Sequence, residues 1–252
     1  MHTILVIAKN TFREAIRDRV LYGMLGFAIL FIALDLFMAR LALGDLVMIR
    51  SFGLAGIYIF GLMITIFLGA SIVHKEIERR TLYFVLSKPV ARGHVIMGKF
   101  IGLFAAVALT TVLMALVYLC VIAYEGGGFD TLALLAIFFQ MLEMGLFIAL
   151  LVFFSSVVAP LTATICAIVI LFVGHLLPTV IQNAEIIGGA VYAVMKVAYY
   201  ILPNLEKFNL RNLVVHDLAP AFVSLLAAFG YAVLYGGILL FLAKGLLEKR
   251  EL

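Results

Sequence analysis

Six long stretches of apolar residues divide this chain, and they constrain its fold more than any other feature. They are residues 20–38, 51–73, 100–124, 131–154, 159–181 and 218–243. A helix needs roughly 20 predominantly apolar residues to cross a bilayer. Inside lipid every backbone polar group must find a partner within the protein, which helices achieve. The stretches therefore predict an all-α integral membrane protein with six transmembrane helices, here called spans, in a single transmembrane domain of residues 1–252.

The composition of the chain supports this class. Hydrophobic residues make up 66% of the 252 residues, and charged residues only 13%. A soluble domain carries about 25% charged residues, so the chain lies outside the soluble range. Its two cysteines, Cys120 and Cys166, both fall in apolar stretches and predict neither a disulfide framework nor a thiolate metal site.

Two segments outside the spans also have helical patterns. In residues 1–19, apolar side chains recur at helical spacing opposite charged ones, which predicts an amphipathic helix on the membrane surface. The alternative is a solvated basic segment that only fixes topology. Residues 186–202 are apolar but contain Lys196. They are predicted to form a re-entrant or interfacial helix before the last span, within an extracytoplasmic segment of residues 182–217.

The distribution of basic residues predicts the orientation. With six spans both termini share one side, and that side holds thirteen basic residues, namely Lys9, Arg13, Arg17, Arg19, Lys75, Arg79, Arg80, Lys88, Arg92, Lys99, Lys244, Lys249 and Arg250. The other side holds five: Arg40, Arg50, Lys196, Lys207 and Arg211. Cytoplasmic loops carry the excess of Lys and Arg. Both termini and residues 74–99 are therefore predicted to be cytoplasmic.

This basic side is expected to face anionic lipid headgroups or a cytoplasmic protein, and no nucleic acid. Residues 74–99 form the one large connection on it, and charges of both signs precede an apolar run there. Such a segment suits docking to a complementary groove, although a loop that only fixes topology is the alternative. Gly93 to Lys99 match the spacing of a phosphate-binding loop, but Phe100 replaces the Ser or Thr that binds magnesium. Nucleotide binding by this chain is therefore not predicted.

The same connection resembles the loop between spans two and three in ABC transporter permeases of the type 2 exporter class. The resemblance is carried by the runs Glu76 to Leu82 and Leu86 to Arg92, followed by Gly98-Lys99 at the start of span three. The amphipathic start, the six spans and the helical insertion before span six agree with it. Residues 203–209 (PNLEKFN) also resemble the segment before span six in the subgroup containing the permease for nitrous oxide reductase maturation.

The resemblance implies a division of labour. The family's permeases work as pairs with two copies of a cytoplasmic ATPase subunit, which binds ATP and Mg, so this chain is expected to bind no cofactor and to hydrolyse nothing itself. It also implies a bacterial cytoplasmic (inner) membrane location and leaves open an extracytoplasmic accessory protein. The residues that it assigns to ATPase coupling are Glu76, Glu78, Arg79, Arg80, Thr81, Ser87, Lys88, Pro89 and Arg92.

Polar residues inside the spans are few. Glu143 lies about halfway along span four, with Gln140 one turn before it, and His175 lies near the outer end of span five. An ionised carboxylate inside the bilayer is costly and is expected to face protein or water. These three side chains are predicted to line a translocation path or to make contacts between helices, and the sequence leaves both open. No metal site is predicted.

Two other functions remain as alternatives to the exporter permease. A secondary transporter commonly shows internal repeats and several polar residues in the membrane, and the sequence shows neither clearly. A membrane assembly factor without an ATPase partner is the other alternative. The substrate, and whether the partner permease is a second copy of this chain or a different one, are left open by the sequence.

Overall fold

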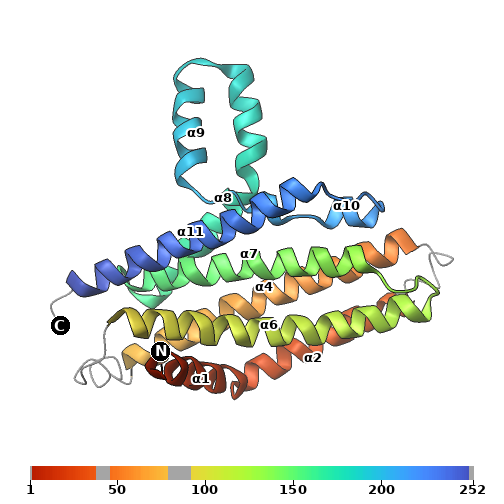
Figure 1. Ribbon diagram of the computed structural model, residues 1–252, viewed down its shortest axis with the longest axis horizontal. Helices are drawn as coiled ribbons and strands as arrows, with labels where there is room; N and C mark the ends of the chain where they lie inside the picture. Colours follow the sequence, from red (N-terminus) through yellow and green to blue (C-terminus); the bar gives the residue numbers. More distant parts are fainter. Residues whose placement is uncertain (1, 38–45, 79–91, 250–252) are drawn as a thin grey trace.

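Long helices packed side by side make up most of the computed structural model, which describes residues 2–37, 46–78 and 92–249 (Figure 1). The elements in chain order are α1 (His2–Ile16), α2 (Arg19–Ala33), α4 (Leu46–Glu78), α6 (Arg92–Tyr124), α7 (Thr131–Ser155), α8 (Pro160–Ile187), α9 (Gly189–Ile201), η1 (Leu205–Phe208), α10 (Arg211–Val215) and α11 (Phe222–Lys249). Within these described residues there is no β-strand, and six helical segments are long and apolar enough to cross a membrane. The predicted fold class is confirmed.

Several helices are longer than the apolar stretches that predicted them. Helix α4 begins at Leu46 and so includes Arg50, and α6 begins at Arg92. Helix α8 continues to Ile187, beyond the expected end of span five at residue 181. Apolar stretches mark only the residues suited to lipid, whereas helical hydrogen bonds continue into polar flanks. This difference places Arg50 on a helix rather than in a connection.

Helix α7 is the centre of the bundle. In its most apolar window 78% of the residues are buried, against 22% for the α2 span and 28% for α8 and α11. It contacts α4, α6, α8 and α11. A helix that is apolar all round belongs in a core, so a polar side chain on α7 needs a partner from a neighbouring element.

Glycines in α4 allow close packing on three neighbouring helices. A Cβ added at Gly53 would lie 2.4 Å from the ring of Tyr118 in α6, and one at Gly61 would lie 2.3 Å from Met144 in α7. Cβ atoms added at Gly56 and Gly69 would likewise meet side chains of α2 and α7. These positions are taken up by helix contacts, as expected for small residues between membrane helices.

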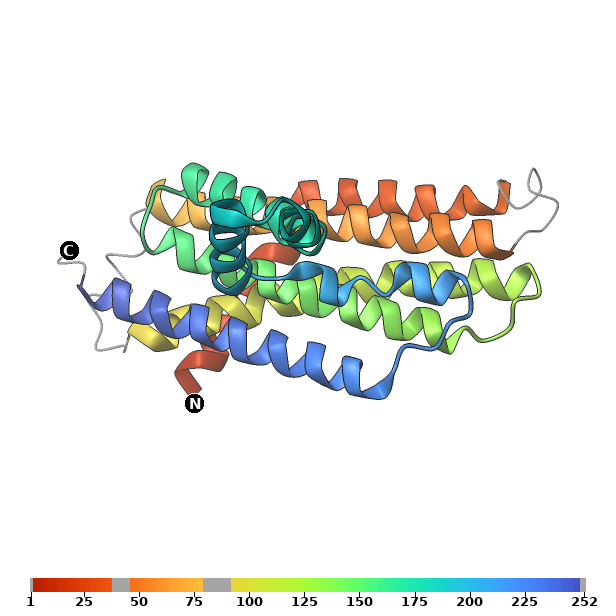
Figure 2. The same ribbon diagram turned by 90° about the horizontal axis from the view of Figure 1, so that it is seen from above.

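Helix α1 runs across the bundle rather than along it, which Figure 2 shows at the N-terminal label. It packs on α6, where Gly98 and Gly102 admit its backbone: an added Cβ at Gly102 would lie 2.5 Å from the carbonyl oxygen of Ala8. Its Lys9 and Arg13 are exposed while Ala8 is buried. The helix is therefore amphipathic, and its position on the membrane surface stays a prediction.

Helices α8 and α9 form a hairpin that projects away from the bundle (Figures 1 and 2). His175 of α8 still contacts α7, and Pro178 follows three residues later inside the helix. Proline lacks the backbone N–H and opens the helical ladder. At the hairpin's tip Gly188 adopts a φ of 70°, and glycine tolerates this region without strain. After the hairpin, the chain returns to the bundle through η1 and α10.

The helix ends divide between the two ends of the bundle. Glu78 at the end of α4, Arg92 at the start of α6 and Lys249 at the end of α11 lie at the end near which α1 crosses (Figure 1). Residues 125–130, between α6 and α7, lie at the opposite end with α10. The end of α4 and the start of α6 thus share an end of the bundle with α1 and the end of α11, as the six-span pattern predicts.

Candidate functional site

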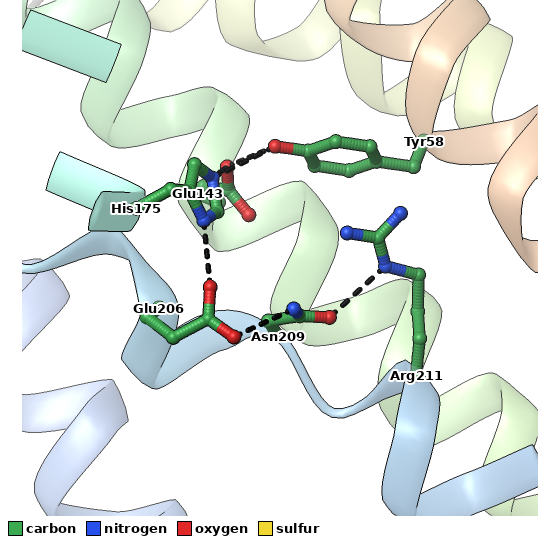
Figure 3. A network of polar contacts seen from close by, with 6 residues as sticks. All are labelled: Tyr58, Glu143, His175, Glu206, Asn209 and Arg211. Carbon is green, nitrogen blue, oxygen red and sulfur yellow. Dashed lines mark hydrogen bonds and ion pairs between the residues drawn. The ribbon is translucent and has the colours of Figure 1, made fainter. Parts of the chain in front are cut away.

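A network of polar side chains joins five elements in the interior of the bundle (Figure 3). At its centre Oε1 of Glu143 in α7 accepts a hydrogen bond from the Tyr58 hydroxyl of α4 at 2.8 Å. The same oxygen lies 2.8 Å from Nε2 of His175 in α8. On the other side of the imidazole ring, Nδ1 lies 2.9 Å from Oε2 of Glu206 in η1. The imidazole therefore bridges two carboxylates from different parts of the chain.

Two further residues close this network into a ring. Asn209 donates from Nδ2 to Oε1 of Glu206 at 2.8 Å, and Arg211 donates from Nε to Oδ1 of Asn209 at 3.0 Å. The guanidinium carbon of Arg211 lies 4.0 Å from the centroid of the Tyr58 ring, a cation–π contact. The network thus returns to Tyr58, which also bonds Glu143, and the contact holds α10 against α4.

Charge balance decides how such a network persists in a low-dielectric interior. Glu143 is 1% exposed, and a buried charge is tolerated only with an opposite charge and satisfied hydrogen bonds. Both ring nitrogens of His175 face carboxylate oxygens, and only a protonated imidazole has donors on both nitrogens. The network therefore holds two acidic side chains, Glu143 and Glu206, and two basic ones, His175 and Arg211, together with the neutral side chains of Tyr58 and Asn209. Acidic and basic groups are thus matched in number.

Gln140 lies on the same side of α7 but makes a different contact. Its Nε2 donates to the backbone carbonyl of Leu54 in α4 at 3.4 Å, one turn before Tyr58. Its buried Oε1 has no hydrogen-bond partner among the described residues. The sequence paired Gln140 with Glu143, and the structure shows both side chains at α4, while Glu143 alone of the two contacts His175.

A second polar cluster surrounds Arg50, two turns before Tyr58 on α4. Its Nε lies 2.8 Å from Oδ2 of Asp130, and its Nη1 lies 2.6 Å from Oδ1 of Asp217. Asp130 also accepts the backbone N–H of Ala133 at 3.0 Å and so caps α7. Arg50 therefore ties the start of α7 and the turn after α10 to α4, as Tyr58 does farther along the same helix.

The residues assigned to ATPase coupling fall largely outside the described side chains. Glu76 and Glu78 end α4 as backbone, and their side chains are not described; Arg79, Arg80, Thr81, Ser87, Lys88 and Pro89 lie outside the described residues altogether. Arg92 is described. Its Nη1 donates to the carbonyl oxygens of Leu247 and Glu248 in the last turn of α11, a contact that the sequence did not predict.

The near-match to a phosphate-binding loop has a different explanation. Gly93 to Phe100 form the first turns of α6, and a continuous helix does not wrap around a phosphate as a loop does. Gly98 instead lies against Ile7 of α1. Within the part of the chain that the structure describes, no three His, Cys, Asp or Glu side chains are arranged to hold a metal ion.

Sequence reasoning identified two of the six residues of the polar network as candidates. Glu143 and His175 were predicted because charged and imidazole groups are rare in spans. Tyr58 and Arg211 were missed, since a tyrosine in an apolar helix gives no signal and Arg211 was counted only as a loop charge. Glu206 and Asn209 entered only within the resemblance of residues 203–209. The sequence did contain a signal at residues 203–209, because charged residues that interrupt an apolar segment are often the partners of a buried charge.

A comparison with known proteins matches nearly the whole chain to one family. The model of the family described as "ABC-2 family transporter protein" matches residues 5–246, which include all six spans and both polar clusters. A search among curated proteins found no match for the chain.

Proposed function

We propose that this chain, which belongs to the ABC-2 family of transporter proteins, is the permease of an ATP-driven exporter and takes its energy from a separate ATPase subunit. As a member of that family with six apolar helices, it is an integral membrane permease subunit of an ABC transporter. The direction of transport, two copies of the ATPase and a pair of permease chains belong to the proposal. So does a bacterial inner membrane with both termini in the cytoplasm.

One observation carries this function. The ends of α4 and α6 that flank residues 79–91 lie at the same end of the bundle as α1 and the end of α11. A partner that docks there meets the starts or ends of four helices at once. Arg92, at the start of α6, is already bonded to α11. A force that a partner applies at this end of the bundle would therefore act directly on the transmembrane helices. This arrangement suits a permease whose energy comes from a separate subunit.

The polar network supports a role for the other half of the molecule. It holds helix α8 and the segment 203–211 against α4 and α7, through contacts in which His175 links Glu143 to Glu206. We propose that this ring closes the outer half of the bundle at rest and opens when the spans move. Residues 203–209 contribute Glu206 and Asn209 to the ring. A relationship to the nitrous oxide reductase maturation subgroup is also proposed, on the sequence resemblance of these residues alone.

Copurification with an ATPase tests the function. The tagged chain is expressed with candidate ATPase subunits encoded near it, purified in detergent, and assayed for bound ATPase and for ATP hydrolysis. We expect an ATPase subunit to copurify. In the double variant Glu76→Ala/Glu78→Ala, we expect the permease to insert normally while the bound ATPase or its permease-dependent hydrolysis is lost.

A matched double variant controls for the loss of two acidic charges. Glu125→Gln/Asp217→Asn removes two charges at the opposite end of the bundle and is expected to leave copurification and hydrolysis unchanged. The proposed function is wrong if no ATPase subunit associates with the unaltered chain. The assignment of Glu76 and Glu78 is wrong if both double variants behave like the unaltered protein.

A further inference from the structure

We propose that Arg92 is a positioning residue that links the ATPase-docking connection to α11, and that α11 carries ATP-driven motion to the base of the α8–α9 hairpin. The proposal rests on the proposed function, because it takes the motion to enter at residues 74–99. It adds a specific route through the bundle. The route has an inner contact at Arg92, a rigid helix, and an outer contact at the residues that follow the hairpin.

The inner contact joins the first turn of α6 to the last described turn of α11. Arg92 donates from Nη1 to the carbonyl oxygens of Leu247 and Glu248, the latter at 3.1 Å. Carbonyl groups near a helix C-terminus are open to such donors, and a positive charge there is favoured by the helix dipole. A Cβ added at Gly93 would lie 3.0 Å from Cδ of Lys244. The two helices thus meet where a side chain at position 93 would crowd them.

The helix between the two contacts is continuous. Helix α11 runs from Phe222 to Lys249 without interruption over 28 residues, about 42 Å at 1.5 Å per residue. It packs on α6 and α7, with Ala228 and Ala243 buried near its two ends. A displacement imposed at one end of a hydrogen-bonded helix reaches the other end, because stretching or compressing the helix would break backbone hydrogen bonds.

The outer contact is made by two tyrosines of α11 to backbone atoms at the end of the hairpin and just after it. The hydroxyl of Tyr231 accepts the backbone N–H of Asn204 at 2.9 Å, and the hydroxyl of Tyr235 donates to the carbonyl of Ile201 at 2.8 Å. The ammonium group of Lys207, within η1, lies 4.3 Å from the centroid of the Tyr231 ring. These contacts thus lie directly before η1 and on it, and η1 carries Glu206. Movement of α11 therefore acts on the segment that supplies one carboxylate to His175.

The test follows the hairpin directly and needs no substrate. A genetically encoded fluorescent amino acid replaces Ile186, which is 85% exposed near the hairpin's tip. The chain is purified with its ATPase, and the change in fluorescence on adding ATP and Mg is measured. We expect a change in the unaltered complex. In Arg92→Gln we expect the change per ATP hydrolysed, measured on the complex that copurifies with its ATPase, to fall by about fivefold or more. Arg13→Gln, which removes an exposed charge from α1, is the matched control and is expected to respond fully.

A covalent link separates transmission from a merely structural role. In a background with Cys120→Ala and Cys166→Ala, the variant Arg92→Gln also receives Gly93→Cys and Lys244→Cys, and a short bis-maleimide joins the two thiols by alkylating each of them. We expect the joined protein to regain the fluorescence change that the same sample lacks before joining. Retained ATPase binding with an unchanged response in Arg92→Gln overturns this inference alone, and so does a failure of the link to restore it. Loss of the ATPase from the unaltered chain overturns the proposed function as well.

Discussion

Nε2 of His175 lies 2.8 Å from Oε1 of Glu143. This pair is close to the point at which α8 leaves the bundle to form the projecting hairpin with α9. Glu143 is buried at the centre of α7, whereas His175 stands three residues before Pro178. The pair joins the most enclosed helix of the protein to the helix that leaves it. Without His175, Glu143 is a fully buried acid that keeps only the Tyr58 hydroxyl among these contacts, so Glu143 is expected to depend on His175 more than on its other neighbours.

The first prediction follows from this dependence. His175→Leu leaves the Glu143 carboxylate buried with the Tyr58 hydroxyl and without the imidazole, and breaking a buried pair in this way costs about 3–5 kcal/mol. Replacing both partners, as Glu143→Met/His175→Leu, removes the unpaired charge and is expected to recover most of that loss. Thermal or denaturant unfolding of the purified protein in detergent measures both variants. Equal instability of the single and double variants would show that the pair is not the unit of stability.

The second prediction contrasts the two acids bound to Arg50. The Asp130 side chain is 3% exposed and also caps α7, whereas the Asp217 side chain is 70% exposed. Asp130→Ala is expected to lower the free energy of unfolding by about 2–4 kcal/mol, because it removes the buried partner of Arg50 and leaves the arginine only the exposed Asp217, and because it removes an N-cap. Asp217→Ala is expected to cost about 0–1 kcal/mol, as for an exposed ion pair. Unfolding of both variants, measured side by side, is the check, and equal losses would contradict this ranking.

The fold was predictable because lipid imposes a strong rule on composition. Six apolar stretches were sufficient to predict six helices, and their number was sufficient to predict which helix ends share an end of the bundle. The ends of the helices were less predictable. Arg92 to Lys99 look like loop in a hydropathy reading, yet they are helical and held by α1 and α11. Packing between segments that are distant in sequence determines where these helices begin and end, and such packing cannot be read from a single sequence.

The polar network shows the same limit at the level of side chains. An acidic or imidazole side chain in a span indicates that the fold provides a partner for it, so Glu143 and His175 could be identified from the sequence. Which residue provides the partner depends on how α8 bends and where η1 returns. The distance in sequence between His175 and Glu206 gives no hint that their side chains lie 2.9 Å apart. Arg50 is a similar case, because its acids follow it by many residues.

The third prediction concerns orientation, which rests on the basic residues alone. In a cysteine-free background, Phe129→Cys places a thiol in the exposed turn between α6 and α7, and Arg17→Cys places one just after α1, near the opposite end. A membrane-impermeant thiol reagent applied to intact cells is expected to label position 129, and to label position 17 only after the membrane is opened. The positive-inside distribution is the reason. The reverse pattern would place both termini outside.

The last prediction tests whether the glycines of α4 act through packing. An added Cβ at Gly53 would lie 2.4 Å from the ring of Tyr118, which is fully buried and whose hydroxyl is bonded to Asp130. A rigid, anchored ring cannot move aside, so Gly53→Ala is expected to destabilise by about 1–3 kcal/mol. At Gly61 the nearest atom is the terminal methyl of Met144, and a flexible thioether can rotate away, so Gly61→Ala is expected to cost less.

Gly230 of α11 provides the control for these two substitutions. Nothing lies within 4 Å of a Cβ added there, so Gly230→Ala is expected to be neutral or to stabilise by up to about 1 kcal/mol through helix propensity. Unfolding midpoints of the three variants in the same detergent give the ranking. A loss at Gly230 equal to that at Gly53 would mean that glycine acts in these helices through backbone freedom. The predicted order instead requires that contact with Tyr118 decides the cost.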